Sequence, residues 1–70
     1  MVKLNNFYFN GQKYSTVKLI TLSDLIDYFA YKSFIFIVEY NNYICNEIEW
    51  NKIEINNDDK IEIITIVGGG

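Results

Sequence analysis

The alternation of apolar and polar residues at the start of the chain predicts a β-hairpin. Leu4–Phe9 is rich in aromatic side chains and is typical of a strand. Asn10-Gly11 follows, and this dipeptide favours a type I′ turn because both central residues of that turn need a positive φ. The returning strand is predicted over Gln12–Val17, where Tyr14 and Val17 are the apolar members.

A helical period replaces the strand pattern in the next segment. Thr21 is a good N-cap, and Asp24 three residues later makes a capping box and places a negative charge in the first turn. We therefore predict a helix over about Leu22–Tyr31. Its apolar stripe has the spacing i, i+3, i+4 and i+7, is expected to pack on the core, and consists of Leu22, Leu25, Ile26 and Phe29.

The second half of the chain is predicted to hold further strand-like segments joined by polar turns. Residues of high β propensity dominate these segments, and asparagine and aspartate mark the turns between them. In order, they are a strand at Phe34–Tyr40, a turn at Asn41-Asn42, a return that starts at Tyr43-Ile44, a shorter and less regular piece at Ile48–Ile55, a turn at Asn56–Asp59 and a last strand at Lys60–Val67.

This order of elements predicts an α+β domain of the β-grasp (ubiquitin-like) class. One helix with a single apolar stripe buries that stripe across one face of a sheet. If the first and last strands are neighbours, the centre of a mixed sheet is parallel and its edges are hairpins. That pairing rests on knowledge of the fold, because periodicity gives no strand order. We expect the domain to span residues 1–67 and a flexible glycine tail to span residues 68–70.

The length and charge of the chain narrow the classes of function. Seventy residues fit one domain with one core and leave little room for an elaborate active site. The net charge is -3, and all six basic residues are lysines, so arginine, the usual bidentate ligand of phosphate, is absent. This balance argues against nucleic acid as a partner and favours docking on basic protein surfaces.

The apolar runs and the residue usage predict the cellular location of the chain. The apolar runs are far too short to span a bilayer, and the start lacks the pattern of a signal peptide, so we expect a soluble, mature chain without a membrane partner. Isoleucine, asparagine, lysine and tyrosine are abundant while proline, histidine and arginine are missing, which favours A/T-rich codons. The expected location is the cytoplasm, or the plastid stroma if an organelle encodes the chain.

Few side chains could carry chemistry on the domain itself. Cys45 is the single cysteine, and no histidine exists to activate it, so a buried apolar role is expected. A zinc site of the usual kind is not predicted for the same reason. We expect no catalytic residue and no metal site. An acid–base pair among the carboxylates is the alternative to solvated charge, and the candidates are Glu47, Glu49, Glu54, Asp58, Asp59 and Glu62.

The sequence ends in Gly68-Gly69-Gly70, and such a tail suits chemistry at a terminal carboxylate. Glycine lacks Cβ, so the tail can thread a narrow channel and its carbonyl carbon stays open to attack. Ordering the tail on docking costs about 1–2 kcal/mol per residue, which hydrogen bonds to a partner strand can offset. The alternative is an idle flexible end or a cloning remnant.

Several segments together resemble the ThiS family, the sulfur carriers of thiamine biosynthesis, and more distantly the small subunit of molybdopterin synthase. The resemblance covers nearly the whole chain, although members commonly have glycine where Asn42 stands and a proline soon after it. The segments that carry it are Asn10-Gly11, Thr21–Ile26, Val38–Asn41, Trp50, Asp58–Ile63 and Val67–Gly70.

The resemblance implies that the chain is a protein co-substrate and not an enzyme. A ThiF-like activating enzyme would use its own ATP and Mg²⁺ to adenylate Gly70, with Gly68 and Gly69 as the rest of the reactive tail. Sulfur would then replace AMP and leave a thiocarboxylate, which a ThiG-like thiazole synthase would accept. The carrier itself would bind no cofactor.

One face of the predicted sheet is a candidate docking surface for these partners. If Glu39 and Glu62 point away from the helix, strand alternation puts isoleucines beside them, and an exposed apolar patch usually marks a binding surface. The alternatives are a reversed register or cover by the stretch Ile44–Ile55. The predicted docking residues are Ile35, Ile37, Ile64, Ile66 and Val67, whereas Phe36, Val38, Ile61 and Ile63 would face the core.

The same terminal chemistry serves other functions, which the sequence separates poorly. The chain could carry sulfur for molybdopterin or for tRNA thiolation. It could also be a ubiquitin-like modifier joined through Gly70 to lysines of other proteins. A binding module with an unused tail is a third class.

Overall fold

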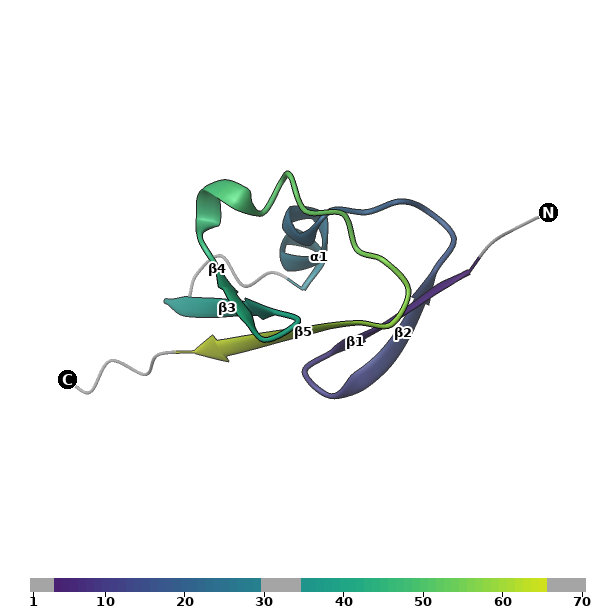
Figure 1. Cartoon of the computed structure of the whole chain (residues 1–70), viewed down its shortest axis with the longest axis horizontal. Coiled ribbons are helices and arrows are strands. Elements are labelled where there is room, and N and C mark those ends of the chain that lie inside the picture. The colour runs from purple at the N-terminus through teal and green to yellow at the C-terminus, as the bar shows by residue number, and fades with distance from the viewer. Residues whose placement is uncertain (1–3, 30–34, 66–70) are drawn as a thin grey trace.

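The computed structural model describes residues 4–29 and 35–65 and shows one helix lying across one face of a five-stranded sheet (Figure 1). A short 3₁₀ helix follows the fourth strand. The elements in chain order are β1 (Asn5–Phe9), β2 (Gln12–Thr16), α1 (Leu22–Tyr28), β3 (Phe36–Tyr40), β4 (Tyr43–Cys45), η2 (Glu47–Glu49) and β5 (Asp59–Thr65).

The strand order is β2-β1-β5-β3-β4, so the first and last strands lie side by side at the centre of the sheet. β1 and β5 run parallel, and the other three neighbouring pairs are antiparallel. This mixed sheet with α1 across one face confirms the predicted β-grasp class. The predicted boundary between domain and tail at residues 67 and 68 lies outside the described residues.

The first hairpin forms as its turn sequence predicts. Asn10 and Gly11 have φ values of 51° and 82°, the positive values that a type I′ turn needs. Phe9 and Gln12 face each other across the turn, and this register places Phe7 and Phe9 on the buried side of β1. The hairpin is therefore set by local chemistry and supplies two aromatic rings to the core.

Helix α1 begins where the sequence predicts and ends earlier than predicted. The Thr21 Oγ1 accepts a hydrogen bond from the Asp24 N–H at 3.1 Å, and the Asp24 carboxylate accepts one from the Thr21 N–H at 2.9 Å. The helix ends at Tyr28, so the predicted end at Tyr31 is wrong. Phe29 leaves the helix with φ −90° and ψ 1°, and its ring stacks on Phe9 at 4.4 Å between centroids. Tertiary packing of this ring coincides with the early end.

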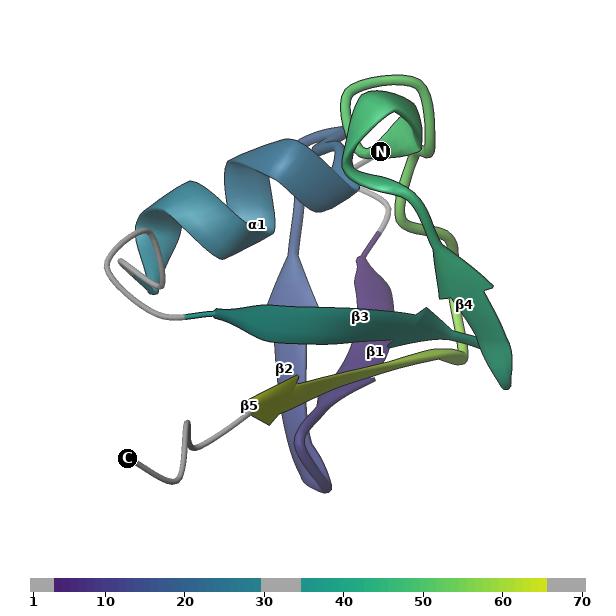
Figure 2. The same cartoon turned by 90° about the vertical axis from the view of Figure 1, so that its left-hand side faces the viewer.

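The core lies between α1 and the sheet and includes the predicted helix stripe. Leu22, Val38, Ile55 and Ile61 are its largest fully buried side chains. The irregular stretch after β4 closes the core from the helix side, because Leu22 N–H donates to the Ile53 carbonyl at 2.8 Å and the Trp50 ring stacks on Phe36. Figure 2 shows η2 and this stretch beside α1, so they do not cover the opposite face of the sheet.

Candidate docking face and exit of the tail

Strand β5 leads toward the C-terminal glycines, and its two halves have different neighbours. Its first residues, Asp59–Ile61, pair with β1, while Ile61–Thr65 pair with β3. Among the described residues, the second half of β5 therefore has a neighbouring strand on one side only. Figure 1 shows this end of β5 pointing away from the β1–β2 hairpin. The last described part of β5 thus has no neighbouring strand on the side of β1.

The hairpin turn fixes the point at which β5 leaves β1. The Asn10 N–H donates to the Ile61 carbonyl at 2.9 Å, and the Ile63 N–H donates to the Asn10 Oδ1 at 2.8 Å. The second bond satisfies a strand N–H that β1 is too short to reach. We define this pair of contacts as the Asn10 clip. It holds β5 in register two residues before the strand's last described residue.

A buried carboxylate fixes the other end of β5. Asp59 is only 7% exposed, and its oxygens accept hydrogen bonds from the Tyr40 hydroxyl at 2.5 Å, the Asn41 Nδ2 at 3.0 Å and the Asn56 N–H at 2.7 Å. Burial, the hydrogen bond to Asp59 and that carboxylate's charge raise the pKa of Tyr40 to about 12. These donors come from the end of β3, the β3–β4 turn and the loop before β5, so the network anchors β5 against β3.

The face of β3 and β5 that points away from α1 carries isoleucines and two acids. Ile37 lies opposite Ile64, and Glu39 lies opposite Glu62. Ile64 is 44% exposed, and Ile37 is half-buried. Like charges directly opposite each other on a sheet are unfavourable by a few tenths of a kcal/mol to about 1 kcal/mol. A basic side chain from a partner would relieve this repulsion.

Most residues of β3 and β5 point to the side of the sheet that the sequence predicts. Val38 and Ile61 are buried, and Phe36 and Ile63 pack against the core, so the reversed register is excluded. Ile35 is an exception, because it does not lie on the outer side of the sheet with Ile37 and Ile64. It precedes β3, is 73% exposed and lines a groove beside α1 together with Asp27. The remaining predicted site residues, which are Ile66, Val67, Gly68, Gly69 and Gly70, lie outside the described residues.

Sequence reasoning missed one member of this face. Ile44 on β4 lies opposite Glu39 and is 59% exposed, so it extends the patch to the edge of the sheet. The signal was present in the short return strand after Asn41-Asn42, where alternation from Tyr43 fixes its side. We define the outer face by Ile37, Ile44 and Ile64 around Glu39 and Glu62.

The domain itself offers little reactive chemistry in the part of the chain that the structure describes. Cys45 is buried, and burial, followed by the nearby Glu49 charge, raises the pKa of its thiol, so it stays protonated at neutral pH. Within residues 4–29 and 35–65 no cluster of histidine, cysteine or carboxylate side chains has the geometry of a metal site. The same residues include no helix with the length and apolarity needed to cross a bilayer.

Comparison with known proteins shows the family to which the chain belongs. The sequence model of the ThiS family matches residues 7–70, which is nearly the whole chain and includes the terminal glycines. The fold is similar to the crystal structure of the thiamine biosynthesis protein (ThiS) from Geobacter metallireducens, with a TM-score of 0.76. That match covers 93% of this chain and 99% of the other at 19% identity. At this level of identity the likeness shows the shared fold.

Relatives of higher identity carry the name uncharacterized protein ycf40. The protein of that name from Trieres chinensis is 56% identical over 64 residues, which cover 91% of this chain and 88% of the relative. The one from Pyropia yezoensis is 38% identical and covers 87% and 86% of the two chains. The similarity therefore spans almost the full length of these relatives.

Proposed function

The chain belongs to the ThiS family, and we propose that it carries sulfur as a thiocarboxylate on Gly70 for thiazole formation in thiamine biosynthesis. Proteins of this family are small sulfur carriers and not enzymes in their own right. The chain is therefore a protein substrate on which partner enzymes act. The single observation that carries the proposal is the match to the family through residue 70, which takes in the glycine tail.

The proposed chemistry takes place at the terminal carboxylate. One oxygen of the Gly70 carboxylate attacks the α-phosphorus of ATP, a P–O bond forms, and pyrophosphate leaves. A sulfide from the sulfur donor then attacks the carbonyl carbon, a C–S bond forms, and the C–O bond to AMP breaks. The product is a thiocarboxylate plus AMP. ATP and Mg²⁺ belong to the activating enzyme, and the carrier's role is to present its end.

Presentation of that end depends on how firmly β5 is held. A reacting group must approach within a few tenths of an ångström of the productive geometry, so slack in the strand before the tail would lower the rate. The Asn10 clip and the Asp59 network hold β5 at two points along its length. We infer that they position the tail for both partners, while the glycines supply the freedom to thread a channel.

The outer face is the proposed docking surface for the activating enzyme and the thiazole synthase. Its isoleucines would bury apolar area, and the opposed Glu39 and Glu62 would pair with lysine or arginine of the partner. The negative net charge of the chain would speed such an encounter. We assign no nucleic acid or membrane to this face. The plastid stroma is the proposed compartment, in keeping with a residue usage that favours A/T-rich codons.

The experiment that tests the proposal is carrier-dependent exchange of pyrophosphate into ATP by a ThiF-like enzyme. Deleting Gly70 shortens the reach by about 3.5 Å, and adding one residue replaces the reacting carboxylate with an amide. We expect both variants to lose exchange and to keep the wild-type melting temperature. Exchange at the wild-type rate in both variants would contradict the proposal.

A further inference from the structure

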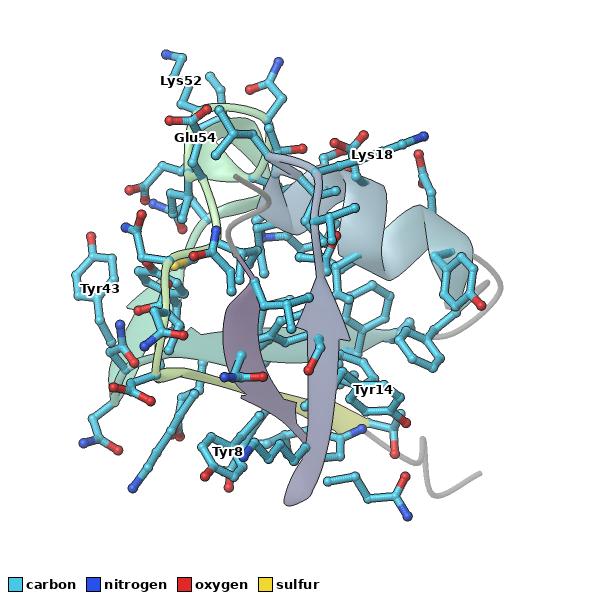
Figure 3. The ribbon with its side chains drawn as sticks, turned by 90° about the vertical axis from the view of Figure 1, so that its right-hand side faces the viewer. Tyr8, Tyr14, Lys18, Tyr43, Lys52 and Glu54 are labelled. Carbon is cyan, nitrogen blue, oxygen red and sulfur yellow. The ribbon has the colours of Figure 1, made fainter. Side chains whose placement is uncertain are left out.

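A groove between β2 and α1 forms a second apolar surface, separate from the outer face. It has a volume of about 460 Å³ and is lined by residues of β1, β2, α1 and the β2–α1 connection. Tyr14 forms its floor with Phe7 and Phe29, whose ring centroids lie 5.9 Å and 5.5 Å from that of Tyr14. Tyr28 at the rim is 82% exposed. Figure 3 looks onto β2 with Tyr14 on the helix side and Lys18 beyond the end of the strand.

The strand beside this groove is an edge of the sheet. β2 stands first in the strand order, so only β1 pairs with it among the described elements. In a two-residue hairpin the hydrogen-bonded pairs start at the residues that flank the turn and recur at every second position. Lys13 and Ser15 occupy the alternate positions, so their N–H and C=O groups point away from β1. An added strand could take these groups as partners.

Charge is distributed unevenly along the chain, and this indicates which kind of ligand would bind beside β2. Residues 1–23 contain three lysines and no acid, whereas residues 24–70 contain all nine acids and three lysines. Lys13 lies on β2, and Lys18 lines the groove. The acid that also lines it, Asp24, is engaged with Thr21 in the capping box. The β2 edge is thus a basic margin on an acidic protein.

We propose that this edge binds an extended acidic segment of a partner protein, which adds as a strand to β2 and places apolar side chains in the groove. The free backbone groups of Lys13 and Ser15 would give the strand its register. The aromatic floor would accept alternate side chains, and Lys18 at the groove would pair with a flanking acid. Lys13 precedes Tyr14 on β2, so it would pair with an acid on the other face of the added strand. Two copies of this chain would bring the same lysines together, so the charges disfavour self-pairing through β2.

This surface leaves the outer face and the tail free for other partners. β2 and the β3–β4 hairpin are at opposite edges of the sheet, so both surfaces can be occupied at once. The carrier could then be held by one partner while its glycine end reacts with another. The proposal does not rest on chemistry at Gly70, and a variant without Gly70 should bind the acidic segment like the wild type.

The test uses labelled peptides of alternating valine and threonine with a run of aspartates at the N-terminus or the C-terminus. Fluorescence anisotropy measures affinity, and NMR shifts of backbone amides locate the site. We expect shifts at Lys13, Ser15 and α1. Lys18→Glu should weaken binding by about tenfold or more, and Lys52→Glu, a matched exchange at an exposed lysine after η2, should not. Both variants should keep the wild-type melting temperature.

Matched probes separate the sources of binding. An otherwise identical peptide with N-methylated backbone cannot pair with β2 and should bind far more weakly. Equal binding of a peptide with lysines in place of aspartates, or shifts confined to the outer face, would overturn the proposal. So would tighter binding of an oligothymidylate at the same amides, or sedimentation showing that a second copy fills the groove. Failure of both aspartate peptides to bind at millimolar concentration would also overturn it.

Discussion

Asn10 and Ile63 are 53 residues apart in the sequence, and the side-chain oxygen of Asn10 accepts a hydrogen bond from the Ile63 N–H at 2.8 Å. The bond crosses from the first hairpin turn to the last strand, at the point where β1 has ended. Asn10, which adopts the positive φ of the turn, thereby also holds the strand that leads to the glycine tail. The turn and the exit of the tail are one structural unit.

The first prediction concerns Asn10→Gly. Glycine keeps the positive φ of the turn but removes the Oδ1 acceptor, so the Ile63 N–H loses its partner. We expect hydrogen exchange at the Ile63 amide to quicken by about fivefold, the equivalent of about 1 kcal/mol. We also expect the KM for the carrier in pyrophosphate exchange to rise.

Asn42→Gly is the matched control. Asn42 also has a positive φ, of 69°, in the turn between β3 and β4, which lies on the side of β5 opposite Asn10. It should leave exchange at Ile63 unchanged. Equal protection of the Ile63 amide in wild type and Asn10→Gly would mean that the clip does not hold β5.

The second prediction concerns the isoleucines of the outer face. Ile64→Asp should weaken binding to a ThiF-like enzyme by about tenfold or more, because a desolvated carboxylate would replace apolar contact. Since Ile64 is 44% exposed, the free energy of unfolding should change by no more than about 1 kcal/mol. Ile37 is half-buried, so Ile37→Asp should lower stability more than Ile64→Asp does. Isothermal titration and thermal melts measure the two effects.

Ile48→Asp serves as the control for this prediction, because Ile48 is 75% exposed in η2 on the helix side of the sheet. It should leave partner binding intact. A loss of several kcal/mol of stability in Ile64→Asp, with binding of the folded fraction unchanged, would identify Ile64 as a core residue and remove the docking role.

The third prediction separates stability from binding at the opposed acids. Glu39→Gln removes the repulsion with Glu62 and should raise the free energy of unfolding by about 0.2–1 kcal/mol. The same change should weaken partner binding. The difference in affinity between Glu39→Gln and wild type should shrink in high salt, because salt screens electrostatic interactions. Glu54→Gln, at an exposed acid remote from β5's outer face, should show neither effect. Tighter partner binding by Glu39→Gln would contradict the expected basic partner surface.

The fourth prediction follows from the Tyr40 hydroxyl. Its pKa is raised from 10.0 to about 12, so the folded state keeps a proton that the unfolded state releases first. This contribution to stability is complete below pH 10 and is lost as the pH rises through 12. The free energy of unfolding should therefore fall between pH 10 and pH 12, and it should fall less steeply in Tyr40→Phe.

At pH 7, Tyr40→Phe should be less stable than wild type by about 1 kcal/mol, because Asp59 loses a donor. Tyr43→Phe is the control, since the Tyr43 side chain is 56% exposed and is not among the donors to the Asp59 carboxylate. Chemical denaturation at each pH provides the measurement. Parallel pH profiles for wild type and Tyr40→Phe would show that the hydroxyl is not held as described.

The features predicted from sequence are those that local chemistry determines. The Asn10-Gly11 turn, the Thr21–Asp24 capping box and the alternation along β3 and β5 each depend on residues a few positions apart. The end of α1 does not follow from a local pattern, because Phe29 fits the apolar stripe of the helix but lies just beyond its last residue, where its ring packs on Phe9 of β1. Strand order came from knowledge of the fold.

Long-range polar contacts also could not be predicted from the sequence. The sequence predicts solvated charge for Asp59 and five other acids, whereas the structure shows Asp59 as a buried carboxylate that accepts three hydrogen bonds. For Asn10, the sequence predicts a turn with Gly11. In both cases the partner lies on a strand whose position depends on the whole sheet, so no local pattern reveals the contact.

The most direct test of the account is intact-protein mass spectrometry, with fragmentation of the C-terminal peptide. The carrier would be incubated with a ThiF-like enzyme, ATP, Mg²⁺ and a sulfur donor. We predict the mass change for one oxygen replaced by one sulfur, located on Gly70 and retained in Cys45→Ser. Sulfur found on Cys45, or an unchanged Gly70 carboxylate while a known ThiS protein is converted in parallel, would contradict the account.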